Sequence, residues 1–178
     1  IQDLLKAMHI PIIEVAGCEA DDLIGTIAKQ AEKQNYQVFM VTPDKDFAQL
    51  VSENIFMYKP ARMGNGIEIW GIPEVLERFE IDRPEQVIDF LGMMGDAVDN
   101  IPGLPGVGEK TAKKFLKEYG SMENLLANTH ELKGKMKENI EANKEKGILS
   151  KKLATIITDC NVTFHEEDYA LSLIHISE

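Results

Sequence analysis

The chain has 178 residues, of which 44% are hydrophobic, and a formal net charge of −11 at pH 7. This length suits one domain or one and a half, and the apolar content is sufficient for a buried core. Apolar runs such as residues 37–42 are far shorter than the ~20 residues of a membrane span, and no basic start followed by an apolar stretch indicates a signal peptide. The composition therefore argues against a membrane protein and favours a cytoplasmic globular one.

The two cysteines, Cys18 and Cys160, are far apart in the sequence and belong to no C-x-x-C or Cys/His pattern. Neither a zinc site nor a disulfide framework is indicated by this spacing. We expect both thiols to be reduced and partly buried. The four histidines, His9, His130, His165 and His175, share no ligand spacing, and with Trp70 they are interpreted as structural.

The negative charge is unevenly distributed along the chain. Residues 1–108 hold 8 Lys+Arg against 18 Asp+Glu, residues 109–152 hold 11 against 7, and residues 153–178 hold none against 5. A lysine-rich segment beside an acidic body is typical of a protein that binds a phosphate backbone and fills an acidic site with metal. Lysines that only solubilise exposed helices are the alternative.

The first elements predict an α/β layer. Residues 1–8 fit a short helix, 11–15 a buried strand, 20–31 an amphipathic helix, and 37–42 a second strand. A strand–helix–strand unit of this kind pairs its strands in parallel. A short helix at 46–51 and two short strands at 54–59 and 66–70, around a turn at residues 64–66, complete this part.

From Ile72 onward the sequence predicts only helices. Helical patterns occupy residues 73–80, 84–94, 109–120, 121–128, 132–144 and 148–158. The second part is thus expected to be a small all-helical subdomain, with the boundary near Gly71.

Acidic residues form three clusters: "EADD" (Glu19, Asp21, Asp22), "PDKD" (Asp44, Asp46) and "GDAVD" (Asp96, Asp99). The first two clusters follow the predicted parallel strands, so we expect them at one carboxyl edge of the sheet, where open α/β folds bind ligands. Only Lys45 lies among them, and oxygen-only ligands favour Mg²⁺ or Mn²⁺ over zinc. Taken singly, the clusters also fit a helix N-terminus, an ordinary turn and a solvated helical face.

The stretch "GLPGVGEKTA" (residues 103–112) is a glycine-rich loop that runs into a lysine-bearing helix. A Walker A loop needs G-x-x-x-x-G-K-[ST], and here Glu109 is inserted before Lys110 and Thr111. The alternative is a hairpin between two helices, in which Gly106 and Gly108 let backbone amides face a DNA phosphate. Such contacts position a duplex without reading its sequence.

Together, "EADD", "TPDKDF", "GDAVDNIPG" and "LPGVGEKTA" closely resemble the 5′–3′ exonuclease domain of bacterial DNA polymerase I, within the structure-specific 5′ nucleases that include flap endonucleases. The resemblance covers roughly residues 9–165. It implies a PIN-like α/β nuclease core with an incomplete parallel sheet over residues 1–70, a helix-hairpin-helix-type (SAM-like) subdomain over 71–170, and a tail of uncertain origin at 171–178.

The resemblance also implies functional residues. The catalytic metal ligands would be Glu19, Asp21, Asp22, Asp44, Asp46, Asp96 and Asp99, holding two Mg²⁺ or Mn²⁺ ions. The duplex-binding hairpin, with a K⁺ ion at its loop, would comprise Gly103, Gly106, Val107, Gly108, Lys110, Thr111, Lys113 and Lys114, followed by Lys117. The implied partner is DNA with a 5′ flap, nick or 5′ end, in the bacterial cytoplasm at the nucleoid, with polymerase domains in the same parent chain.

The resemblance also has departures. A first strand with a metal-binding Asp, a second acidic position and a basic helical arch precede this region in the family, so the chain is expected to be an N-terminally truncated fragment. Two hypotheses therefore stand beside a two-metal nuclease: a catalytically impaired duplex-binding remnant, and a nucleotide-binding α/β protein, which the broken Walker pattern disfavours.

Overall fold

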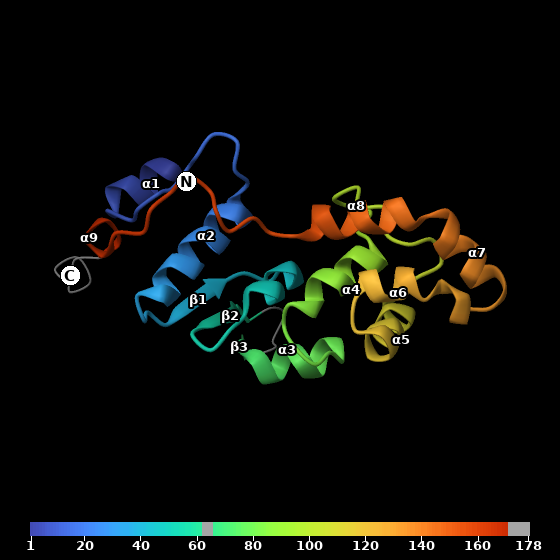
Figure 1. The fold of residues 1–178 in the computed structure, drawn as a ribbon. Coiled ribbons are helices and arrows are strands. Elements are labelled where there is room, and N and C mark those ends of the chain that lie inside the picture. Colours follow the sequence, from blue (N-terminus) through green and yellow to red (C-terminus); the bar gives the residue numbers. More distant parts are fainter. Residues whose placement is uncertain (62–65, 171–178) are drawn as a thin grey trace. The chain divides into compact units, whose positions relative to one another are not determined.

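The computed structural model describes residues 1–61 and 66–170, and these form two compact units (Figure 1). Unit 1 contains Ile1–Tyr36 together with the described residues from Ile157 onward, and unit 2 contains the described residues of Gln37–Ile156. The predicted turn around Gly64 and the predicted tail at 171–178 lie outside the described residues. The predicted boundary near Gly71 stays a prediction.

Unit 1 is built around one long helix. The helices predicted at 1–8 and 20–31 are confirmed as α1 (Gln2–Ala7) and α2 (Ala20–Lys33), and a short α9 (Glu166–Tyr169) follows later in the chain. α2 buries Leu23, Ala28 and Ala31. Ala31 lies three residues after Ala28 and eight after Leu23, and both spacings place residues on one side of a helix.

The strand predicted at residues 11–15 is wrong. This segment has no regular secondary structure, and Ile12 is exposed whereas Ile13 and Val15 are half-buried. Strand formation depends on a neighbouring strand that accepts the hydrogen bonds, and a short apolar run does not reveal whether that neighbour exists.

An extended segment, residues 157–164, runs along α2 and is held by side chains one helical turn apart. Asp22 Oδ1 accepts the Ile157 N–H (2.8 Å), Thr26 Oγ1 accepts the Cys160 N–H (3.1 Å), and Gln30 Oε1 accepts the Phe164 N–H (2.7 Å). Gln30 Nε2 also donates to the Val162 carbonyl (2.8 Å). These positions lie on one face because residues four apart are neighbours on a helix.

The same segment brings the two cysteines together. Cys18 and Cys160, 142 residues apart in sequence, form a disulfide in this structure. The expectation of two reduced thiols is therefore corrected, although both residues are half-buried as expected. Their proximity arises from the path of residues 157–164 along α2, which no local pattern encodes.

Unit 2 begins with a three-stranded sheet in the order β1 (Val38–Val41), β2 (Ile55–Lys59), β3 (Glu68–Trp70). β1 and β2 are parallel and β2 and β3 are antiparallel. The parallel pair is thus formed through the 3₁₀ helix η1 (Lys45–Leu50), and not through the helix at 20–31 as predicted.

The helices predicted after Ile72 are confirmed, with shifts of a few residues at their ends. They are α3 (Ile72–Phe79), α4 (Gln86–Met94), α5 (Glu109–Tyr119), α6 (Met122–Ala127), α7 (Gly134–Ala142) and α8 (Lys144–Ala154), with a 3₁₀ turn η2 (Thr129–Glu131). α8 shows the largest shift, since it begins four residues before the predicted start at residue 148.

α4 is the central helix of this part, packed against α8, α5 and α6 (Figure 1). Its Val87, Phe90 and Met93 are almost fully buried. Its buried Asp89 accepts the Met122 N–H (2.8 Å) and pairs with Lys151 of α8 (2.6 Å), so the buried charge is compensated. Within residues 1–61 and 66–170, none of the helices combines the length and the apolar character that crossing a bilayer demands.

Candidate functional site

Four of the predicted acidic residues lie in unit 2, around Asp46. Asp44 and Asp46 lie at the start of η1, directly after β1, and Asp96 and Asp99 lie in the loop after α4. Burial and the charges of Asp44, Asp96 and Asp99 raise the pKa of Asp46 to about 6, and Lys45 only partly offsets them. The structure therefore brings these four carboxylates into one electrostatic cluster.

Asp46 is the residue of the cluster that most clearly indicates a site for a bound ligand. Its Oδ1 is buried and has no hydrogen-bond partner among the described residues. An unpaired oxygen in a buried position costs free energy unless a proton or a cation satisfies it. The nearby Lys45 Nζ instead lies 3.9 Å from Asp96 Oδ2.

Local hydrogen bonds fix the start of η1. Asp44 caps this helix by accepting the Asp46 N–H (3.0 Å), and its own N–H donates to Thr42 Oγ1 (3.1 Å). Asp44 and Asp46 both lie in this tight 3₁₀ turn, so the charge of Asp44 raises the pKa of Asp46.

The loop that carries Asp96 and Asp99 is closed at its base by two glycines. Asp96 and Ile101 exchange backbone hydrogen bonds (2.9 and 2.7 Å), and Asp96 Oδ1 accepts the Val98 N–H (2.8 Å). Gly95 and Gly103 both have positive φ, and a Cβ on Gly103 would lie 2.7 Å from the Gly95 nitrogen. Only glycine permits this approach, which holds the acidic loop next to the hairpin.

The other three predicted ligands, Glu19, Asp21 and Asp22, lie in unit 1 at the start of α2. Asp22 uses both oxygens within unit 1, since Oδ1 accepts the Ile157 N–H and Oδ2 accepts the Glu19 N–H (3.4 Å). The shared sheet edge expected for this cluster relied on the strand at 11–15, which is not formed. Across the described part of the chain, no three His, Cys, Asp or Glu side chains converge closely enough to hold a metal ion.

The predicted hairpin is present between α4 and α5. Gly106 has φ +84° and is exposed. Gly108 has extended backbone and is the N-cap residue of α5, and the Gly108 carbonyl accepts the Thr111 and Ala112 N–H groups. Val107 is buried, so its side chain belongs to the core. Gly103 is also buried, and its N–H donates to Ser150 Oγ of α8 (2.9 Å).

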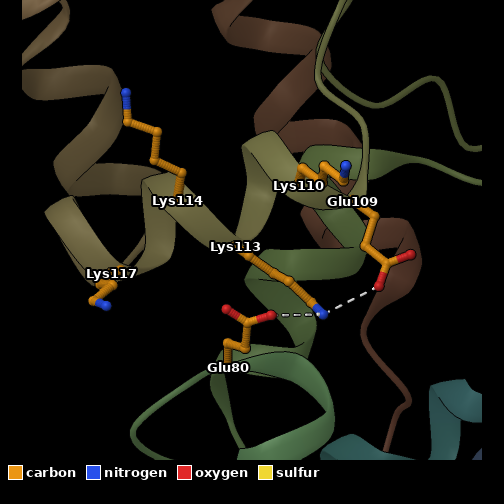
Figure 2. A pocket seen from close by; sticks show the side chains of 6 residues that line it. All are labelled: Glu80, Glu109, Lys110, Lys113, Lys114 and Lys117. Atoms are coloured by element: carbon orange, nitrogen blue, oxygen red, sulfur yellow. Dashed lines mark hydrogen bonds and ion pairs between the residues drawn. The ribbon is translucent and has the colours of Figure 1, made fainter.

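Lysines of α5 line an open pocket of about 490 Å³ together with two glutamates (Figure 2). The lining residues are Glu80, Glu109, Lys110, Lys113, Lys114 and Lys117. Figure 2 shows Lys113 extended between the two carboxylates, to which it is joined by ion pairs. The excess of positive charge in this pocket suits a phosphate backbone.

Two residues that position the site were not found from the sequence. Glu80 belongs to the lysine pocket. Ser150 holds Gly103 in place, because its Oγ accepts the Gly103 N–H and donates to the Lys146 carbonyl (2.7 Å). Glu80 lies 33 residues from Lys113, and Ser150 lies 47 residues from Gly103. Their side chains are common at exposed positions, so composition alone gave no reason to select them.

Family models match nearly the whole chain. The model for the 5′–3′ exonuclease N-terminal resolvase-like domain matches residues 1–80, and that for the 5′–3′ exonuclease C-terminal SAM fold matches residues 82–176. The chain therefore belongs to the 5′–3′ exonuclease family, with a resolvase-like nuclease domain followed by a SAM-fold domain.

Curated relatives agree with this assignment. DNA polymerase I of Bacillus subtilis is 44% identical over 91% of this chain, and the 5′–3′ exonuclease of Aquifex aeolicus is 39% identical over 94% of it. The chain spans 18% of the length of the first relative and 55% of the second.

Solved structures share the fold at lower identity. T5 5′-exonuclease with bound divalent metal ions (zinc) aligns with a TM-score of 0.75 and 24% identity, over 85% of this chain and 55% of that one. The catalytic core of Rad2 in complex with DNA substrate aligns with a TM-score of 0.57 and 19% identity, over 92% and 57%. These matches confirm the fold, an α/β core followed by a helical subdomain.

Proposed function

We propose that this chain contributes the nuclease site and the duplex-binding hairpin of a metal-dependent 5′–3′ DNA exonuclease or flap endonuclease. The observation that carries the proposal is the acidic cluster of Asp44, Asp46, Asp96 and Asp99, in which Asp46 has a raised pKa and a buried, unpartnered oxygen. A cluster of carboxylates that one lysine compensates only in part is what an oxygen-liganded divalent ion neutralises.

The donor set fits Mg²⁺ or Mn²⁺, because all four side chains offer hard carboxylate oxygens and neither sulfur nor imidazole is among them. We expect Asp44, Asp46, Asp96 and Asp99 to hold the ions, with Glu19, Asp21 and Asp22 as the further predicted ligands. When bound, two such ions lower the pKa of a water and offset the charge that develops on the phosphate. The K⁺ ion at the hairpin loop is supported by the family resemblance.

The chain's own residues have two tasks in this proposal. Asp44 fixes the start of η1 and thereby the position of Asp46, and the loop closed by Gly95 and Gly103 holds Asp96 beside them. The lysine pocket on α5 binds the phosphate backbone of a duplex that carries a 5′ flap, nick or 5′ end. No side-chain nucleophile is required.

The parent protein is proposed to be a DNA polymerase I that acts in replication and repair at the bacterial nucleoid, with polymerase domains in the same chain. Supporting this, the relatives include DNA polymerase I of several bacteria, and each is much longer than the present chain.

The test is cleavage of a 5′-labelled flap duplex by the purified 178-residue chain with Mg²⁺ or Mn²⁺. We expect metal-dependent release of short labelled products, lost with EDTA and in Asp44→Asn. Asp168→Asn, which changes an acidic residue of α9 outside the cluster, is the matched control and retains cleavage. Metal-independent cleavage, or equal activity of Asp44→Asn and the control, would contradict the proposal.

A second function, duplex binding without cleavage, is favoured by one observation. In the part of the chain that the structure describes, no three potential ligands are close enough to hold an ion. If binding of the flap duplex persists while neither metal supports cleavage, this chain is a binding module whose chemistry needs further residues of a parent protein.

A further inference from the structure

The four lysines in the α5 pocket are not equivalent. Lys113 Nζ lies 3.1 Å from Glu109 Oε1 and 3.2 Å from Glu80 Oε1, and its side chain is only 17% exposed. Lys114, the next residue, is 67% exposed and has one longer pair, 3.7 Å to Glu118. Among the residues that the structure describes, neither Lys110 nor Lys117 has a carboxylate oxygen within 4.0 Å.

Figure 2 shows the consequence of this difference. The Lys113 side chain points between Glu80 and Glu109, whereas the Lys114 side chain points away from them. Burial lowers the pKa of Lys113, but its hydrogen bonds to Glu109 and Glu80 outweigh this effect and raise it. Lys113 is therefore charged at neutral pH, and its charge is matched by two carboxylates.

Glu80 gives independent support, because it occupies an unfavourable backbone position. It is the C-cap residue of α3 with φ +56° and ψ +49°, a left-handed conformation that glycine or asparagine adopts more readily. A glycine would relieve the backbone but would lose the ion pair with Lys113. The side chain thus has a specific role, which is to tie the end of α3 to α5.

We propose that Lys113 is a masked cation, which means that it positions α5 by bridging Glu80 and Glu109 and does not contact phosphate. The face that binds the DNA backbone is then formed by Lys110, Lys114 and Lys117. This inference rests on the proposed function, since it divides the lysines of the proposed duplex-binding pocket into two roles. The sequence cannot make this division, because residues 110, 113, 114 and 117 all share one helical face.

The salt dependence of DNA binding separates the two roles. Each lysine that contacts a phosphate contributes about 0.9 to the slope of log K against log[salt]. We would measure binding of the 178-residue chain to a nicked duplex in EDTA by fluorescence anisotropy over a range of KCl concentrations. Lys114→Met is expected to reduce the slope by about 0.9. Lys113→Met is expected to weaken binding a few-fold, through the uncompensated glutamates, with less than half that change in slope.

Removing the two carboxylates that pair with Lys113 is expected to change the salt dependence in the opposite direction. In Glu80→Gln/Glu109→Gln, Lys113 is released, and the slope is expected to rise by up to about 0.9. Adding Lys113→Met to this double variant should abolish the rise, which shows that the gain comes from Lys113 and not from the removal of acidic residues alone. An equal loss of slope in Lys113→Met and Lys114→Met overturns the proposal.

Thermal unfolding without DNA tests the positioning role separately. Lys113→Met and Glu80→Gln are each expected to lower Tm by about 1 to 3 °C, with less than additive loss when combined, and Lys113→Arg should retain the wild-type Tm. Fully additive losses would overturn the bridge. If instead Lys110→Met, Lys114→Met and Lys117→Met all leave the salt slope unchanged, the proposed duplex interface itself is wrong, and the masking of Lys113 within it fails for that reason.

Discussion

The acidic cluster and the lysine pocket of unit 2 carry charges of opposite sign, and the two regions differ in which of these charges are compensated by a neighbour. In the cluster, the charges of Asp44, Asp96 and Asp99 raise the pKa of Asp46, and among the described residues Lys45 alone partly offsets them. In the pocket, Lys113 is compensated by two glutamates, whereas Lys110, Lys114 and Lys117 leave an excess of positive charge. Compensated charge stabilises the fold, whereas uncompensated charge identifies the place where a ligand of opposite sign is expected.

The largest expected effect separates chemistry from binding. Replacing Asp96 with asparagine removes one negative charge from the cluster and leaves the α5 lysines intact. We expect the rate of flap cleavage to fall by about 1,000-fold, because the loss of one electrostatic contact to a transition state has an effect of this size. Binding of the flap duplex in EDTA should change by less than about 3-fold, since the phosphate contacts remain. An equal loss of cleavage and binding would mean that Asp96 supports the fold and not the chemistry.

The next largest effect is expected in the loop between α4 and α5, which joins the acidic cluster to the lysine pocket. Gly103→Ala would place a Cβ 2.7 Å from backbone atoms of Met94 and Gly95, at φ +64°. We expect a loss of about 3 kcal/mol in the free energy of unfolding. The matched control is Gly120→Ala, which also has positive φ but meets no atom within 4 Å, and should cost about 1 kcal/mol. Equal losses in urea unfolding would show that the Gly95–Gly103 contact carries no special constraint.

The pKa of Asp46 gives a prediction with a definite sign. Its folded-state pKa of about 6 lies above its unfolded value near 3.8, so ionised Asp46 destabilises the folded state above pH 6, and the penalty disappears as pH falls toward 4. In EDTA, Asp46→Asn should therefore be more stable than wild type at pH 7.5. We expect about 1 kcal/mol, after allowing for solvent screening of a half-buried group.

The comparison is made by urea unfolding at pH 7.5 and pH 4.5. The advantage of Asp46→Asn should shrink at the lower pH, where Asp46 of the wild type is protonated. A variant that is less stable than wild type at pH 7.5 would show that Asp46 is satisfied by contacts within the fold.

The sequence predicted most of the helical part correctly, for a physical reason. The apolar period of α3, α4 and α5 and the glycines after α4 and α5 are local features, and they determine where these helices begin and end. The membership of Asp44, Asp46, Asp96 and Asp99 in one group was also predicted, but from the resemblance and not from the sheet, since the expected strand at 11–15 is not formed.

What the sequence could not predict depends on contacts between distant residues. The Cys18–Cys160 disulfide follows from hydrogen bonds of residues 157–164 to α2, and the masking of Lys113 follows from Glu80, 33 residues earlier. A helical pattern assigns Lys113 and Lys114 to the same face and cannot show which of them is paired.

The most direct test of the account is Mn²⁺ binding to the 178-residue chain at pH 6, measured by titration calorimetry in two buffers of different ionisation enthalpy. We predict saturable binding accompanied by proton release, because the carboxyl of Asp46 must ionise to accept the ion, and we predict that Asp46→Asn loses both. Binding that is unchanged in Asp46→Asn, or no saturable binding in the wild type, would contradict the claim that this acidic cluster is a cation site.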